Sequence, residues 1–205
     1  AVFFIFAMLL GAALQLTNAY GDTYLHDFAS VPAYADSLAV KYPAIVMSIS
    51  QISETLFILA IPFFMIRFGI KTVMLISMLA WVLRFGLFAY GNPGDGLWMI
   101  IVSCIVYGMA FDFFNISGSM FVESQSDASI RASAQGLYMM MTNGFGAVLG
   151  SVASGLVIDA FFTDAAGNMD WRGIWLSFAG YALVVLVLFA LLFKHKHVRQ
   201  PGRAP

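Results

Sequence analysis

Charged side chains are scarce in this sequence. Asp, Glu, Lys and Arg together make up 10% of its 205 residues, whereas 61% of the residues are hydrophobic. A soluble domain contains about 25% charged residues and roughly half apolar ones, so this composition excludes an ordinary soluble protein and predicts one embedded in a lipid bilayer. The formal net charge of −1 argues neither for nor against binding of nucleic acid, and we expect no nucleic-acid partner.

Cysteine and histidine are also rare. The single cysteine, Cys104, lies in an apolar run and cannot form a disulfide within the chain, so we interpret it as a packing residue. The three histidines, His26, His195 and His197, lie outside the long apolar segments and show no metal-ligand spacing. No pairing of a nucleophile with a base stands out. The sequence therefore predicts neither an enzyme nor a metal-binding protein, and we expect no cofactor.

Six apolar segments are each long enough to cross a bilayer, whose hydrocarbon core of about 30 Å requires roughly 20 residues of helix. They span residues 2–25, 44–66, 72–90, 97–122, 130–161 and 173–193. Backbone groups in lipid must hydrogen-bond within their own segment, and the alternation typical of a barrel strand is missing. We therefore predict an all-α membrane protein with six transmembrane helices. Because the first apolar run starts at once at Ala1, which is not a methionine, we expect that further sequence precedes it.

The Lys and Arg residues predict the orientation of these helices. If the six segments alternate in direction, one side of the membrane receives Arg67, Lys71, Arg131, Lys194, Lys196, Arg199 and Arg203. The opposite loops contain only Lys41 and Arg172. By the positive-inside rule, the basic side is cytoplasmic. We therefore expect both ends of the chain in the cytoplasm, with a six-helix unit over residues 1–197 and a cytoplasmic tail over residues 198–205.

Amides and a carboxylate interrupt the first two apolar segments. Gln15 and Asn18 are three residues apart, as are Gln51 and Glu54, so each pair lies on one side of its helix. Amides both donate and accept hydrogen bonds and can read a carbonyl, an imide or a sugar hydroxyl. Each pair therefore predicts a polar stripe that faces a cavity. The alternatives are interhelical hydrogen bonds for the amides and a protonated glutamic acid buried for packing.

Asp112 is a second carboxylate within an apolar segment. A charge at the bilayer centre costs about 3 kcal/mol, so such residues usually face a polar cavity or a partner. Tyr107 and Phe111 share a helix face, which allows both rings to stack on a planar ligand, although such aromatic residues also serve simple packing. Asp112 lies about 140° around the helix from Tyr107. We interpret it mainly as a proton carrier or an ion-pair partner, with Asn115 as a neighbouring amide.

Arg84 is the only basic residue well inside an apolar segment. A guanidinium at this depth needs an anion or a route to the membrane surface. The sequence gives equal weight to two alternatives and less weight to a direct contact with the substrate. Arg84 either pairs with Asp112 or extends its side chain to the interface.

The segment 130–161 is rich in glycine. Gly146 and Gly150 form a pair of small residues four apart, which predicts close approach to a neighbouring helix. Thr142 and Asn143 precede this pair, and either could reach a cavity.

Four stretches of the sequence resemble a known family. They are GAALQLTN (11–18), IVMSISQISETLFILAIPFF (45–64), YGMAFDFFNISGSMFVE (107–123) and IRASAQGLYMMMTNGFG (130–146). They are similar to the bacterial nucleoside permeases of the nucleoside–proton symporter family, which belongs to the major facilitator superfamily. The resemblance covers almost the whole chain and corresponds to spans seven to twelve of a twelve-span transporter. It implies an N-terminal six-helix half as partner and the bacterial inner membrane as the location.

The resemblance implies uptake of nucleosides such as uridine, driven by the proton gradient through alternating access between the two halves. Position by position, it implies substrate contacts for Gln15, Asn18, Gln51, Glu54, Tyr107 and Phe111. It implies Asp112 or Glu54 as the carboxylate that carries the coupling proton. The proton is the only coupling ion implied.

Other functions stay open at this point. A major facilitator transporter of another polar solute, such as a sugar, shares the polar cavity but does not specially need the Tyr107 and Phe111 pair. A membrane enzyme should show a catalytic cluster near an interface, and none is evident in the sequence. A channel would give flux without proton movement, and a structural or assembly module is a further alternative.

Overall fold

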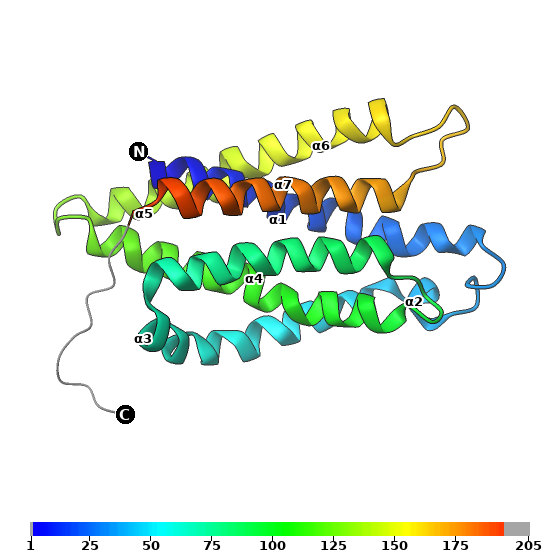
Figure 1. Ribbon diagram of the computed structural model, residues 1–205, viewed down its shortest axis with the longest axis horizontal. Helices are drawn as coiled ribbons and strands as arrows, with labels where there is room; N and C mark the ends of the chain where they lie inside the picture. The colour runs from blue at the N-terminus through cyan, green and yellow to red at the C-terminus, as the bar shows by residue number, and fades with distance from the viewer. Residues whose placement is uncertain (1, 195–205) are drawn as a thin grey trace.

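Long helices make up almost all of the regular structure (Figure 1). The computed structural model describes residues 2–194, and the expected tail, residues 198–205, lies outside them. The main elements are α1 (Val2–Asp27), α3 (Pro43–Tyr90), α4 (Leu97–Ser124), α5 (Arg131–Met139), α6 (Ala147–Phe161) and α7 (Trp171–Leu192). Short elements η1 (Phe28–Ser30) and α2 (Leu38–Lys41) link α1 to α3. Within the described residues, extended pairing is limited to one bridge between Thr163 and Met169, which confirms the all-α expectation.

Five helical stretches in the described part are long and apolar enough to cross a membrane, whereas we expected six. The difference lies in α3, whose 48 residues combine two of the expected segments. A straight helix of that length would measure about 72 Å, more than twice the thickness of a hydrocarbon core. At Gly69 the backbone leaves the helical conformation, with φ 76° and ψ 166°, a region that favours glycine. The arms before and after Gly69 run in opposite directions along the bundle (Figure 1).

The fifth expected segment forms one continuous stretch with an unusual centre. Between α5 and α6 lies η2 (Met140–Gly146), a π-helix. A π-helical turn contains an extra residue and appears frequently at functional sites. The regular pattern of the flanking helices is therefore interrupted where Thr142 and Asn143 occur.

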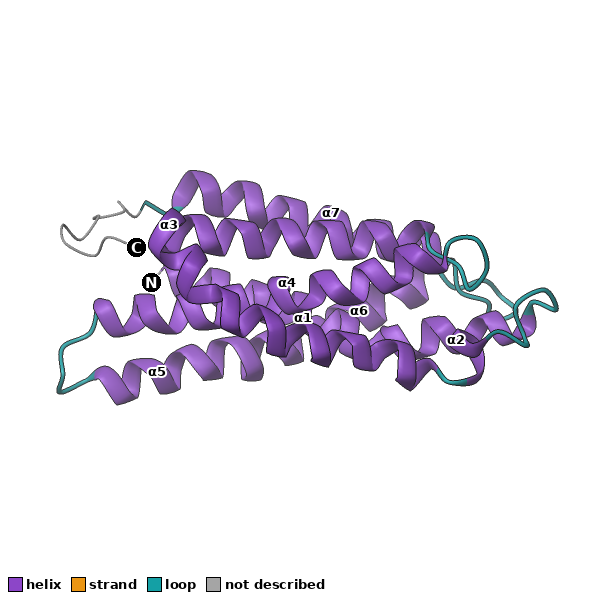
Figure 2. Ribbon diagram, turned by 90° about the horizontal axis from the view of Figure 1, so that it is seen from below, coloured by secondary structure: helices purple, strands orange, loops and turns teal. Residues whose placement is uncertain are grey.

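Aromatic side chains fill the centre of the bundle. Trp175 of α7 packs against two rings of α3, with centroid distances of 6.0 Å to Phe85 and 4.9 Å to Phe88. The Tyr24 hydroxyl of α1 donates a hydrogen bond of 2.9 Å to the Phe88 carbonyl. Cys104 is buried in the same core, as expected for a packing residue. Rings from three helices therefore form one core, and the loops gather at the ends of the bundle (Figure 2).

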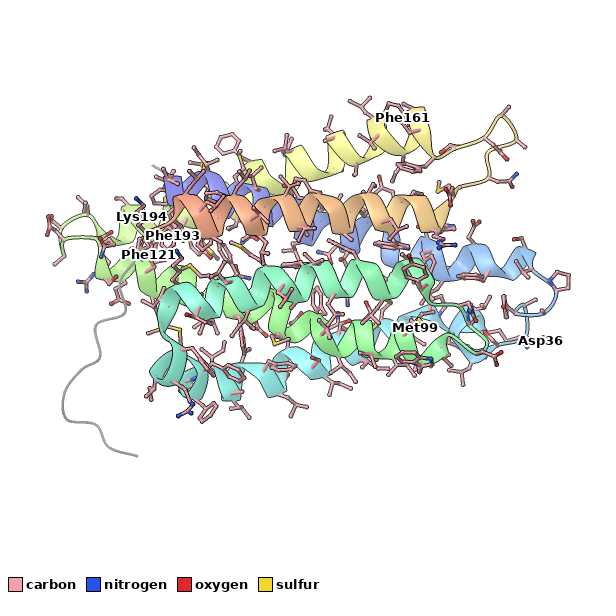
Figure 3. All side chains as sticks on the ribbon, in the orientation of Figure 1. Asp36, Met99, Phe121, Phe161, Phe193 and Lys194 are labelled. Atoms are coloured by element: carbon pink, nitrogen blue, oxygen red, sulfur yellow. The ribbon has the colours of Figure 1, made fainter. Side chains whose placement is uncertain are left out.

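Large apolar side chains also cover the outside of the bundle. Leu59, Phe161 and Leu191 are 76%, 78% and 68% exposed. Figure 3 shows side chains projecting from the outer faces of the helices, with Phe161 on α6. An apolar surface of this extent is unfavourable in water but suits contact with lipid. The charged Lys194 and Asp36 lie at opposite ends of the bundle, as Figure 3 also shows.

Helix α1 touches the π-helix backbone directly. A Cβ atom added to Gly11 would overlap the carbonyl group of Thr142, and one added to Gly146 would overlap the Met8 carbonyl. A Cβ on Gly150 would meet the backbone of Ala12. The predicted close approach at Gly146 and Gly150 is therefore confirmed, and Gly11 is its counterpart on the first helix.

Gly11→Ala should destabilise the bundle, because the added methyl group would push α1 away from the Thr142 backbone. Overpacking of this kind costs about 1–3 kcal/mol. We expect a lower midpoint of thermal unfolding for the purified full-length protein in detergent. Gly155→Ala is the matched control, since a Cβ there meets no atom within 4 Å. Equal midpoints for the two variants would contradict the close approach.

Candidate functional site

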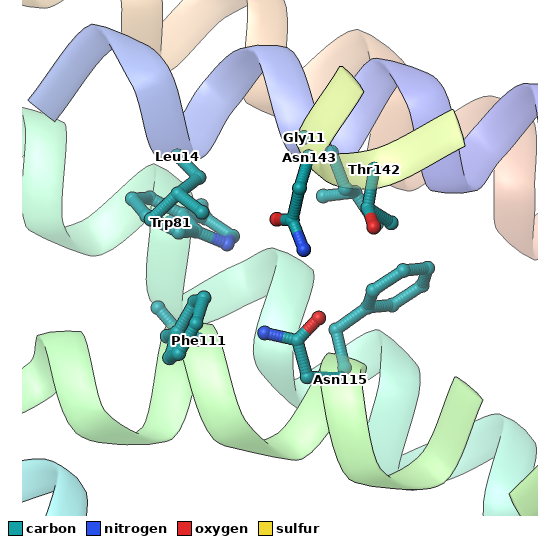
Figure 4. Close-up of a pocket in the computed structure, with 10 residues that line it drawn as sticks. Gly11, Leu14, Trp81, Phe111, Asn115, Thr142 and Asn143 are labelled. Carbon is teal, nitrogen blue, oxygen red and sulfur yellow. The ribbon is translucent and has the colours of Figure 1, made fainter. Parts of the chain in front are cut away.

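A pocket opens between α1, α3, α4 and the π-helix η2 (Figure 4). Rings and polar groups share its wall: Trp81, Phe111, Phe114, Asn115, Thr142 and Asn143. Gly11 and Leu14 of α1 complete the wall beside η2. The wall of the pocket therefore combines aromatic rings with hydrogen-bonding groups, the two kinds of group that line small-molecule sites.

Tyr107 supports the aromatic wall from behind. Its ring stacks on that of Phe111 with a centroid distance of 5.8 Å and an interplanar angle of 2°. Trp81 meets the Tyr107 ring edge-on at 5.8 Å. Tyr107 is buried and does not line the pocket, whereas Phe111 does. The Phe111 ring therefore faces the pocket, and the Tyr107 ring packs behind it and holds it in place.

Arg84 is fully buried, and its contacts overturn both alternatives drawn from the sequence. No ion pair with Asp112 occurs in the described residues, and the side chain does not reach the surface. Its Nη1 donates to the Ser103 carbonyl at 2.7 Å, and its Nε donates to the Thr17 hydroxyl at 3.4 Å. The guanidinium also lies 4.5 Å from the centroid of the Tyr107 ring. A carbonyl, a hydroxyl and a π-face thus replace the expected anion, because helix packing brings them to this charge.

The second contact of the guanidinium is the Phe88 ring, whose centroid lies 4.9 Å from the Arg84 Cζ. Within residues 2–194, the Arg84 Nη2 has no hydrogen-bond partner. Arg84 therefore keeps one free donor group in the interior of the bundle.

Of the two expected carboxylates, Glu54 lies within electrostatic reach of this cation, and Asp112 lies within reach of Glu54. Glu54 is half-buried and interacts electrostatically with Arg84 and with the Tyr107 hydroxyl. Asp112 is 5% exposed, interacts with the charge of Glu54, and has no described hydrogen-bond partner for its Oδ2. The structure thus gathers two acids, a phenol and a guanidinium between α3 and α4.

A close contact between α3 and α4 explains why these groups meet. The Ser53 hydroxyl donates to the Ile105 carbonyl, and a Cβ on Gly108 would overlap the backbone at Ser53 and Glu54. Small residues let the two backbones approach, which brings the acids of both helices into one region.

Comparison with known proteins identifies the family. The sequence profile of the family described as Nucleoside H+ symporter matches residues 1–198. The chain belongs to the nucleoside H+ symporter family. It is 61% identical over 198 residues to the xanthosine permease of Escherichia coli (strain K12), covering 96% of this chain and 47% of that protein. It is 57% identical over 202 residues to the nucleoside permease NupG of the same strain, covering 98% of this chain and 48% of NupG.

A solved structure agrees with this assignment. The crystal structure of nucleoside transporter NupG superposes with a TM-score of 0.89 at 57% identity, over 96% of this chain and 48% of that one. The chain therefore spans about half the length of the curated relatives that it matches.

The chain brings some of its expected site residues together and leaves others apart. Phe111 lines the pocket, Tyr107 stacks on Phe111, and Glu54 and Asp112 lie within electrostatic reach of Tyr107. The amides expected to bind substrate do not line the pocket: Gln15 is half-buried, whereas Asn18 and Gln51 are exposed. When the Gln51 amide is oriented with its nitrogen toward the backbone carbonyls of its own helix, it donates a hydrogen bond of 2.8 Å to the Met47 carbonyl.

Sequence reasoning named Asn115 only as an amide near Asp112, not as a substrate contact, and it did not mention Trp81. Asn115 follows Phe111 by four residues, so helical spacing alone was a usable signal for it. Trp81 carries no such signal, because only the packing of α3 against α4 turns its ring toward Phe111 and the pocket.

Arg84→Met should lower the midpoint of thermal unfolding in detergent, because the Ser103 carbonyl loses a charged donor. Hydrogen bonds to charged groups contribute about 1.5–3 kcal/mol. Arg172→Met is the matched control, since Arg172 is exposed and only stacks on the Tyr90 ring at 4.8 Å, a contact worth about 0.5–1 kcal/mol. An unchanged or higher midpoint for Arg84→Met would mean that desolvation of this cation offsets its contacts.

Proposed function

We propose that this chain is the C-terminal half of a proton-coupled nucleoside transporter, a secondary active transporter and not an enzyme. The observation that carries the proposal is the similarity of nearly the whole chain to the xanthosine permease and NupG. The pocket supports it, since rings and amides suit a planar, hydrogen-bonding ligand. The rest of the protein would supply an N-terminal six-helix half and the opposite wall of the cavity. A sugar carrier has no comparable support, because the relatives described above are named as nucleoside or xanthosine permeases.

We infer six membrane crossings in this half, equivalent to spans seven to twelve of a major facilitator transporter. The arms of α3, residues 43–68 and 70–90, measure about 39 and 32 Å, so each has the length of one crossing. The Lys71 ammonium donates to the Ala190 carbonyl at 3.1 Å, close to Lys194. This basic end of the bundle is the cytoplasmic end in our proposal, with both chain ends there and the protein in the bacterial inner membrane.

The chemistry and the exposure of the side chains support the proposed substrate contacts. Phe111 offers its face to the nucleobase, and Tyr107 keeps that ring in orientation. Asn18 and Gln51 are exposed amides on otherwise apolar helices, which suits groups that face a cavity between two halves. Gln15 lies near Asn18 in α1, Glu54 lies near Gln51 in α3, and both are half-buried. We propose that they contact the nucleoside once the two halves close around it.

Asp112 and Glu54 are the proposed carriers of the coupling proton. A charge at membrane depth costs about 3 kcal/mol, so a neutral carboxyl group lowers the cost of closing the site around the substrate. Asp112 is the more buried of the two, and it lies within electrostatic reach of Glu54. Uptake of a proton from outside and its release to the cytoplasm would then accompany each nucleoside through alternating access.

Uridine added to vesicles that contain the full-length protein should cause alkalinisation of the external medium, because each imported nucleoside carries protons inward. A pH electrode or an external pH-sensitive dye measures this directly. Uridine flux without a proton signal would indicate facilitated diffusion instead.

Asp112→Asn should abolish accumulation while exchange of uridine across the membrane continues, because the amide cannot carry a proton. With an imposed pH difference of about one unit and one proton per nucleoside, the wild type can accumulate uridine about tenfold. We expect a ratio near one for the variant, measured with labelled uridine. Asp159→Asn, at an exposed acid in α6, is the matched control and should accumulate normally. Normal accumulation by Asp112→Asn would remove Asp112 from the coupling role.

A further inference from the structure

Two amides in the pocket make almost no hydrogen bonds to the described part of the chain. Asn115 belongs to α4 and Asn143 to η2, and both line the pocket. Figure 4 shows their side chains pointing toward one another from opposite sides of the pocket, with Trp81 and Phe111 beside them. The two hydrogen-bonding groups therefore face one another beside aromatic rings.

The hydrogen-bonding capacity of both amides is almost unused within the described residues. The Asn115 side chain has no hydrogen bond there, and the Asn143 Nδ2 reaches only the Met139 sulfur at 3.9 Å, a weak acceptor. Gln135 in α5 provides the contrast. Its Nε2 donates to the Ser119 carbonyl at 2.8 Å and its Oε1 accepts from the Ser119 hydroxyl at 3.1 Å. The Gln135 amide therefore uses both its nitrogen and its oxygen in hydrogen bonds, whereas the pocket amides leave most of their donors and acceptors unused within the described residues.

Tyr138 connects the two backbone segments from which the two amides project. Its buried hydroxyl donates to the backbone carbonyls of Phe114 at 3.3 Å and Asn115 at 3.4 Å. Its own carbonyl accepts a 3.0 Å hydrogen bond from the Thr142 hydroxyl, next to Asn143. The close contact of Gly11 with the Thr142 carbonyl fixes the same point from the α1 side. Both amides thus project from backbone that is already positioned before a ligand arrives.

We propose that Asn115 and Asn143 read the hydrogen-bonding edge of the nucleobase while its ring stacks on Phe111. This inference rests on the proposed nucleoside transport and assigns base recognition to residues that lie apart from the amides of α1 and α3. A pair of amides can match adjacent donors and acceptors, as in the N3–H and O4 groups of uridine. A site built to bond such groups rejects a ligand that lacks them, because its own polar groups are then left unpaired.

The test compares uridine with N3-methyluridine, in which the donor of this edge is blocked. Full-length protein in membranes is assayed by competition of each compound against labelled uridine. We expect the wild type to bind uridine about tenfold more tightly than the methylated compound. In Asn115→Leu and Asn143→Leu, uridine affinity should fall and the ratio of the two affinities should approach one. The ratio does not depend on how much protein folds, and Asn115→Ser and Asn143→Ser provide milder variants.

Gln135→Leu is the control for a purely structural effect, because this amide is bonded to Ser119 and does not line the pocket. It should lower stability and leave the ratio at its wild-type value. Equal affinities of the wild type for both compounds, or an unchanged ratio in every Asn115 and Asn143 variant, would overturn the inference while nucleoside transport stands. Failure of the wild type to bind any nucleoside would instead overturn the proposed function, and the inference with it.

Discussion

The Arg84 guanidinium joins three helical segments at membrane depth, and the aromatic wall of the pocket depends on it. It reaches from α3 to Thr17 on α1 and to the backbone of α4 at Ser103. It also covers the Tyr107 ring, which stacks on Phe111. Lipid offers no water to solvate the charge, so these protein groups must remain in place around it. The orientation of Phe111 in the pocket is therefore linked to a cation that never touches the pocket itself.

Close backbone contacts determine the other side of the site. Gly11 lets α1 touch the π-helix at Thr142, and Gly108 lets α4 approach α3 beside Glu54. Without a hydrophobic driving force between helices in lipid, such contacts depend on van der Waals packing and hydrogen bonds. The polar groups of η2 consequently lie against α1, and the acids of α3 and α4 lie within electrostatic reach of each other, although these residues are distant in the sequence.

Much of the fold follows from the sequence. The lengths of the apolar segments, and the need of their backbone groups to form hydrogen bonds within a helix, leave few alternatives in a bilayer. The expected break near residues 67–71 corresponds to the reversal at Gly69, although one continuous helical element spans both sides. The site was less accessible to this reasoning. Helical spacing shows that Gln51 shares a face with Glu54, but it does not show that Gln51 is exposed and bonded to its own helix. The partners of Arg84 were missed for the same reason, since a carbonyl and a π-face carry no sequence signal.

By itself, the sequence determined that the chain is helical, that it belongs in a membrane and that its acids, amides and single interior arginine occur at membrane depth. These properties depend on composition and on spacing along one helix, which are local. Only the tertiary structure decided which polar groups meet. Asn115 and Asn143 face one another, and Arg84 lies against Tyr107 without pairing with Asp112, because the rotation and separation of neighbouring helices depend on contacts such as that of Gly11 with Thr142. Those contacts join residues far apart in the chain, and their geometry arises from packing.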